Sequence, residues 1–184
     1  MKYAAFFKGL NAGGHNIVKM ADLKALFSDL GFSAAESYIQ SGNIVFSADI
    51  EASDLINSIT AAFEQRLGFK APVVIRTIDE IQEIIKCRPF SDEDIAEADR
   101  HNPDVEHLYV FLFESPVNCD DLKKFTENIQ YSEKFYLMER EILFLTHNSI
   151  RDSKAAAALA RMKIPQTSRN MNTMNKIWEM MSNL

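Results

Sequence analysis

Residues 35–48 read A-E-S-Y-I-Q-S-G-N-I-V-F-S-A, two short stretches of strand-like sequence separated by Ser41-Gly42-Asn43. These three residue types favour a tight reversal, because glycine and asparagine adopt positive φ at little cost. The stretch therefore predicts a β-hairpin with strands at about 35–40 and 43–48. A lone two-stranded hairpin is only marginally stable, so it needs further strands or a helix to pack against. The order of the elements on either side of the hairpin therefore indicates the fold.

Hydrophobic periodicity predicts one strand and one helix before the hairpin, and one helix and one strand after it. The strands are expected at about 3–8 and 73–76, and the helices at about 20–30 and 55–67, the second ended by Gly68. The resulting order, βαββαβ, is that of a ferredoxin-like domain. We expect its antiparallel sheet to have the strand order 4-1-3-2.

The second half of the chain repeats this order of elements without repeating the sequence itself. Apolar runs predict strands at 108–113, 135–138 and 142–145, and helices are expected around 122–129 and in the alanine-rich stretch 151–163. A short extended piece and a last helix follow. We therefore predict an α+β protein made of two tandem ferredoxin-like subdomains with antiparallel sheets.

Composition also suggests where the subdomains divide. The first is expected to span 1–77, a connecting helix and acidic linker 78–104, and the second subdomain with its C-terminal helix 105–184. Residues 77–80 have the pattern of a capping box, which would open the connecting helix. The acidic segment 91–104 is expected to be a solvated loop or frayed helix. A metal-binding cluster there would need a ligand geometry that the sequence does not enforce.

Charge and cysteine usage exclude several classes of partner. The formal net charge of −6 argues against double-stranded nucleic acid, because duplex binding depends on neutralising phosphates. Cys87 and Cys119 lack the spacing of a metal site or a redox pair, so both are expected to be reduced thiols. Lys8 interrupts the first apolar run, and no segment has the ~20 apolar residues of a membrane span. We expect a cytoplasmic protein with no membrane partner, no metal and no cofactor.

The functional prediction concerns the edge where the loop after the first strand meets the hairpin. In the 4-1-3-2 order the first and second strands point the same way, so 11–16 should lie beside 40–43. Gly13 and Gly14 leave backbone N–H groups uncovered, which favours a bound anion together with the start of the first helix. Lys8 would add a full positive charge. The alternative for both stretches is structural, because Gly-Gly and Ser-Gly-Asn are also ordinary turns.

A third polar stretch, 166–173, precedes the last helix. Arg169 either aims its guanidinium at a phosphate or carboxylate, or pairs with a surface carboxylate. Asn172 or Thr173 is the expected N-cap of the helix. The candidate ligand-binding residues are Lys8, Asn11, Gly13, Gly14, His15, Gln40, Ser41, Asn43, Arg169 and Asn170.

Three stretches resemble the signature blocks of domain-of-unknown-function family 1697, a group of mostly bacterial proteins. They are K-G-L-N-A-G-G-H-N (8–16), Y-I-Q-S-G-N-I-V-F (38–46) and T-S-R-N-M-N-T-M-N-K-I (167–177). The resemblance implies a tandem ferredoxin-like α+β fold and implies no activity. Lys8, Ser168 and Met171 stand where the family typically has Arg, Thr and Trp. A two-pronged contact at position 8 and aromatic stacking at position 171 therefore do not carry over.

The sequence thus predicts that the edge near 11–16 and 40–43 binds a small anionic or polar ligand, and it leaves open whether that ligand is also transformed. Two alternatives come from other classes of function. Phe6, Tyr38, Phe46 or Tyr109 would stack on bases if the sheets bound single-stranded nucleic acid. The other alternative is an interaction or scaffold protein, in particular a homodimer formed through sheet edges or the C-terminal helix.

Overall fold

The computed structural model describes all of residues 1–184. The chain divides into two compact units, one of Met1–Ile85 together with Met174–Leu184, and one of Lys86–Thr173. Each unit contains a four-stranded antiparallel sheet with helices, which confirms the predicted tandem α+β architecture. The predicted connecting segment 78–104 is divided between the two units, and the last helix from Met174 onward is grouped with the first unit rather than the second.

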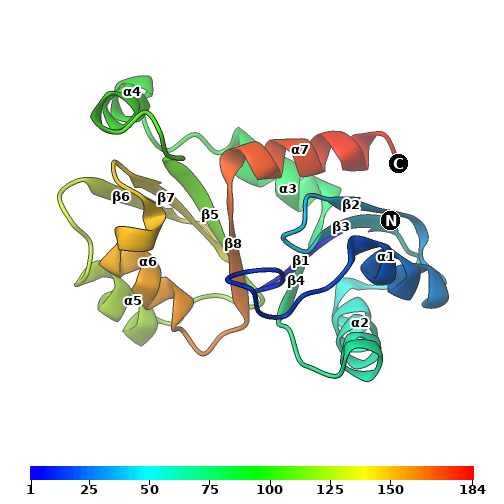
Figure 1. Ribbon diagram of the computed structural model, residues 1–184. Coiled ribbons are helices and arrows are strands. Elements are labelled where there is room, and N and C mark those ends of the chain that lie inside the picture. The colour runs from blue at the N-terminus through cyan, green and yellow to red at the C-terminus, as the bar shows by residue number, and fades with distance from the viewer. The chain divides into compact units, whose positions relative to one another are not determined.

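The first unit follows the predicted order of elements (Figure 1). They are β1 (Lys2–Phe7), α1 (Met20–Asp29), β2 (Ser33–Tyr38), β3 (Asn43–Ser47), α2 (Ala52–Leu67), β4 (Val73–Thr77) and α3 (Ile78–Lys86). The strands lie in the order β2-β3-β1-β4, which is the predicted 4-1-3-2 read from the other edge. β1 is central, because Tyr3 pairs with Phe46 on one side and with Thr77 on the other.

Helices α1 and α2 cover one face of this sheet (Figure 1). Tyr3 and Phe7 point to that face and belong to its core, where the ring of Phe7 stacks on that of Phe63 at a centroid distance of 5.0 Å. Ala4 and Phe6 point to the opposite face and are also fully buried. Both faces of β1 are therefore shielded from solvent, which explains why its sequence is a continuous apolar run rather than an alternation.

The helix boundaries in this unit follow local chemistry that the sequence displays. Gly68 ends α2 in the left-handed conformation, with φ 77°. Thr77 and Glu80 form the predicted capping box at the start of α3. Glu80 accepts a hydrogen bond from the Thr77 N–H at 2.7 Å, and Thr77 Oγ1 accepts one from the Glu80 N–H at 3.2 Å.

The second unit repeats the topology with strand order β6-β7-β5-β8. Its elements are α4 (Asp92–His101), β5 (Leu108–Phe113), α5 (Cys119–Thr126), β6 (Glu133–Leu137), β7 (Glu141–Thr146), the 3-10 turn η1 (Ile150–Asp152), α6 (Lys154–Ala160) and β8 (Gln166–Asn170), followed by α7 (Met171–Ser182). The core on the α5 and α6 side contains Phe111, Phe113, Phe125, Phe144 and Leu159. None of the helices of the chain combines the length and apolar character needed to cross a membrane.

The acidic segment, for which a solvated loop or a frayed helix was expected, forms the capped helix α4. Ser91 Oγ accepts a hydrogen bond from the Asp94 N–H at 3.1 Å, and Asp94 returns the contact by accepting from the Ser91 N–H at 3.1 Å. Ala98 is fully buried and packs in a cluster with Leu143 and Leu145 of β7. Ile95 of the same helix packs against this cluster, so a capping box and two apolar side chains hold a strongly charged helix on the sheet.

Candidate functional site

The loop after β1 forms a small hairpin of its own. The Asn11 N–H donates to the Asn16 carbonyl oxygen at 3.1 Å, and the His15 N–H donates to the Ala12 carbonyl oxygen at 3.1 Å. Gly13 and Gly14, with φ 59° and 78°, supply the pair of positive φ values that a type I′ turn requires. The turn alone therefore explains why glycine occupies both positions. The tip that the two glycines form is exposed to solvent.

Asn11 connects this loop to the β2–β3 hairpin. Its Nδ2 donates to the Gln40 carbonyl oxygen at 2.7 Å and to the Val18 carbonyl oxygen at 3.0 Å, and its Oδ1 accepts from the Val18 N–H at 2.8 Å. The expectation that 11–16 lies beside 40–43 is therefore confirmed. We call these contacts the Asn11 clamp, and we call residues 8–16 with 40–43 the rim.

The tip of the β2–β3 hairpin is packed against β1. Asn43 is fully buried, and its Nδ2 donates to the Tyr38 carbonyl oxygen at 3.2 Å and to Ser41 Oγ at 2.9 Å. Gly42 has φ 76°, and a Cβ there would lie 2.9 Å from the Cβ of Phe7. Only glycine fits that position. The hydrogen bonds of the buried Asn43 amide stabilise the turn of the hairpin.

The rim concentrates unusual backbone conformations. Positive φ values occur within it at Gly9, Asn11, Gly13, Gly14, Asn16 and Gly42, and directly beside it at Ile39. Ile39, with φ 48°, is a β-branched residue in a region that such residues rarely adopt, and its side chain is 52% exposed. Backbone strain of this kind occurs preferentially at functional sites.

The remaining predicted residues of the rim differ in exposure. Gln40 and His15 are exposed, whereas Lys8, directly after β1, is half-buried. Burial lowers the pKa of the Lys8 ammonium below its usual value, because the charged form loses contact with water. The rim thus contains one partly desolvated positive charge.

Arg169 and Asn170 belong to the second unit. Asn170 Oδ1 accepts a hydrogen bond from the Thr173 N–H at 2.9 Å, so the prediction of Asn172 or Thr173 as N-cap of the last helix is wrong. Asn172 instead donates to Glu106 at 3.0 Å. Arg169 donates to Thr167 Oγ1 and to the Ser168 carbonyl oxygen, both at 2.7 Å, and burial lowers its pKa to about 10. That guanidinium is still charged at neutral pH.

Two of the four aromatic residues considered for base stacking are unavailable. Phe6 and Phe46 are fully buried, and Phe46 stacks on Tyr3 at a centroid distance of 5.7 Å. Tyr38 and Tyr109 are half-buried. Because base stacking needs an accessible ring face, the prediction is wrong for Phe6 and Phe46.

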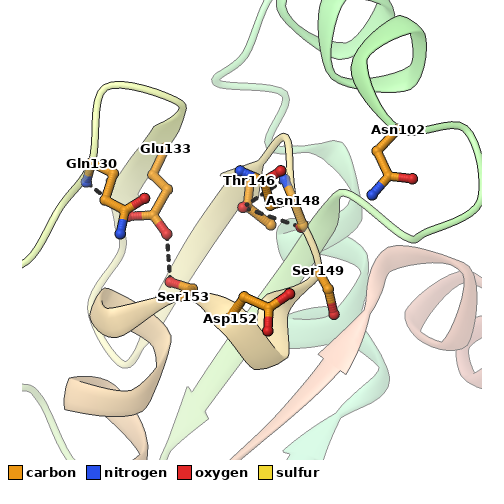
Figure 2. A pocket seen from close by; sticks show the side chains of 8 residues that line it. All are labelled: Asn102, Gln130, Glu133, Thr146, Asn148, Ser149, Asp152 and Ser153. Carbon is orange, nitrogen blue, oxygen red and sulfur yellow. Dashed lines mark hydrogen bonds between the residues drawn. The ribbon is translucent and has the colours of Figure 1, made fainter.

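A polar cavity that the sequence analysis missed lies in the second unit (Figure 2). It measures about 280 Å³ and is lined by Asn102, Gln130, Glu133, Thr146, Asn148, Ser149, Asp152 and Ser153. The pairing of Glu133 with Thr146 brings the start of β6 to the end of β7. Strand pairing therefore brings residues that are distant in the sequence to one cavity. In the sequence, each of them resembles an ordinary cap or turn residue.

The family described as "Protein of unknown function (DUF1697)" matches residues 1–143. The chain belongs to the DUF1697 family. A search of curated proteins found no match.

Among solved structures, this DUF1697 protein is similar to the conserved bacterial protein SP0830 from Streptococcus pneumoniae, with 22% sequence identity and a TM-score of 0.75. The match covers 98% of each chain. At this identity the similarity shows the fold alone. Function must therefore be argued from the sites.

Proposed function

We propose that the DUF1697 protein binds a small anionic or polar ligand at the rim of its first unit. The observation that carries this proposal is the Asn11 clamp, because it holds two polar segments at one edge of the sheet in a fixed geometry. Preorganisation of this kind lowers the entropic cost of binding. Nδ2 and Oδ1 of Asn11 are already hydrogen-bonded within the protein, so the ligand would contact other groups of the rim.

The hydrogen-bond donors for the ligand are backbone groups. The N–H groups of Gly13 and Gly14 donate to no acceptor within the protein, and a Cβ built on either glycine would have no neighbour within 4 Å. Successive N–H groups in a turn form concavities that suit anions. The N-terminus of α1, which follows this loop at Met20, has no side-chain cap and carries the partial positive charge of its first N–H groups.

Lys8 supplies the charge that the backbone lacks. Its ammonium is partly desolvated, which its lowered pKa reflects. A bound anion would compensate for that desolvation, so binding is expected to raise the pKa of Lys8 again. Gln40 and His15 are exposed at the same rim and would add further polar contacts.

The test is a titration of ¹⁵N-labelled protein with inorganic phosphate at low ionic strength. We expect the amide resonances of Gly13 and Gly14 to shift, and Lys8→Ala to weaken binding about tenfold, the effect of one charge-assisted contact. Lys24→Ala is the matched control, because Lys24 is an exposed lysine on α1. Unshifted glycine resonances, or equal weakening by both substitutions, would refute the proposal.

A further inference from the structure

The cavity of the second unit shares no residue with the rim and has the opposite electrostatic character. All eight lining residues are polar, two of them, Glu133 and Asp152, are acidic, and none is Lys or Arg. A volume of about 280 Å³ is large compared with the ~30 Å³ that one water occupies and lies near the lower end of ligand pockets. The cavity can therefore hold a small ligand, and an anion would be repelled.

The floor of the cavity is rigid. Glu133 is 6% exposed and accepts two hydrogen bonds, one from the Ser153 hydroxyl and one from the Gln130 N–H at 2.8 Å. Ser153 Oγ also accepts from the Ala156 N–H at 3.0 Å and so caps α6. Figure 2 shows the Glu133 carboxylate directed at Ser153. Because both carboxylate oxygens have donors, this charge is already stabilised without a bound cation.

The walls of the cavity are held by a buried histidine. His107 Nδ1 lies 2.7 Å from the Thr146 carbonyl oxygen, and Nε2 lies 3.0 Å from the Asn102 carbonyl oxygen. Thr146 and Asn102 both line the cavity, so one side chain ties together two of its walls. This fixes the backbone at both positions before any ligand arrives.

Four side chains that line the cavity have no partner within the protein. The side chains of Asn102, Gln130, Asn148 and Asp152 make no hydrogen bond or ion pair to any protein group. They come from the segment after α4, the loop before β6 and the β7–α6 connection (Figure 2). Three carboxamides and one carboxylate with no partner in the protein thus line one cavity.

We propose that this cavity binds a small uncharged polyhydroxyl compound of monosaccharide size. A hydroxyl both donates and accepts, and carboxamides and carboxylates together offer the complementary acceptors and donors. Anions are disfavoured by Glu133 and Asp152, and no group of three His, Cys, Asp or Glu residues is placed to hold a metal ion.

The experiment is a titration of ¹⁵N-labelled full-length protein with millimolar glucose, galactose, mannose, ribose and glycerol, each in a separate sample. We expect at least one compound to shift the resonances of Gln130, Asn148 and Asp152. Gln130→Ala and Asp152→Ala should each weaken this binding about fivefold or more, the effect of one hydrogen bond. Both side chains are exposed, so neither substitution is expected to disturb folding.

Asp120→Ala is the matched control, because Asp120 is an exposed aspartate on α5 that does not line the cavity. It should leave the binding unchanged. Ethanolamine and inorganic phosphate serve as cationic and anionic probes. The proposal is overturned if none of the polyhydroxyl compounds shifts the cavity resonances, if only ethanolamine or phosphate shifts them, or if Asp120→Ala weakens binding as much as Asp152→Ala.

Discussion

The two units share one strand order, yet their corresponding cavities have different linings. In the first unit, a cavity of about 290 Å³ lies between the α1–β2 and β3–α2 connections, and Leu30, Phe32, Ala48 and Ile50 contribute to its lining. In the second unit, the connections at the same topological positions enclose about 280 Å³ and contribute only polar residues. The shared fold therefore accounts for a cavity at this position in both units. The entirely polar lining is a property of the second unit alone.

At the other end of the central strands, the loop of the first unit is the longer one. Between β1 and α1 the first unit has the long glycine-rich loop of the rim, whereas between β5 and α5 the second unit has only residues 114–118. That short loop ends in Asn118, whose side chain caps α5 by accepting from the Asp121 N–H at 2.9 Å. Each unit has thus elaborated a different connection, which is the pattern expected if the two serve different ligands.

The largest effect expected is on the hairpin of the first unit. Gly42→Ala should destabilise the protein by about 3 kcal/mol, because it combines a positive φ with a Cβ forced against Phe7. Gly14→Ala is the comparison, since Gly14 has a similar φ but open space around it. It should cost about 1 kcal/mol. Denaturant unfolding gives both values, and equal losses would show that the contact with Phe7 is unimportant.

The second largest effect is expected at the start of α6, which follows β7, and it is compared with the start of α2, which follows β3. Ser153→Ala should destabilise the second unit by about 2 kcal/mol, because it removes the cap of α6 and a donor to buried Glu133. The equivalent position before α2 is Glu51, whose side chain makes no capping hydrogen bond. Glu51→Ala should change the unfolding free energy by less than about 0.5 kcal/mol. A loss at Ser153 as small as that at Glu51 would contradict this account of the cavity floor.

A smaller loss is expected from opening the Asn11 clamp. Asn11→Gly keeps the positive φ of 54° without strain and should destabilise the first unit by about 1 kcal/mol, because three hydrogen bonds at a partly exposed site are replaced by bonds to water. Hydrogen exchange provides the specific readout. The Val18 amide, which donates to Asn11 Oδ1, should exchange faster in the variant. Unchanged exchange at Val18 would mean that the loop is held by other contacts.

The smallest effect concerns protonation of one lysine in each unit. Burial lowers the pKa of Lys8, whereas the hydrogen bond from Lys134 to Asp94 raises that of Lys134. In an NMR titration of the lysine side chains, Lys8 should therefore deprotonate at lower pH than Lys134. Since the folded-state pKa of Lys8 is depressed, its burial opposes folding while the amine is charged, and that penalty disappears as pH rises above the unfolded-state pKa. The reverse order of titration would contradict the burial of Lys8.

The sequence was sufficient to predict the strand order and the meeting of the two rim segments. The reversal at 41–43, the end of α2 at Gly68 and the capping box at 77–80 are local signals, and strand order then follows from the sequence of elements. For the acidic segment the sequence left a solvated loop and a frayed helix both open, because its charge suggested a segment exposed to solvent. The Ser91–Asp94 pair, which has the capping-box spacing, was the signal that indicated a helix.

The parts that escaped prediction depend on tertiary contacts. An amide such as Asn11 can cap, clamp or bind a ligand, and the sequence does not say which carbonyl oxygen it will reach. The burial of both faces of β1, which removed Phe6 and Phe46 from any binding surface, depends on what covers each face of the sheet. The cavity residues are spread over several connections, so no motif joins them. Anion binding, the homodimer and the cytoplasmic location stay predictions.

One measurement tests directly whether the two units serve different ligands. A single ¹⁵N-labelled sample of the whole protein is titrated first with inorganic phosphate and then with the polyhydroxyl compound that binds best. We predict that phosphate shifts the resonances of Gly13 and Gly14 and leaves those of Gln130 and Asn148 unchanged, and that the second compound does the reverse. If both compounds shift the same set of resonances, or if neither shifts any of the four, the account is contradicted.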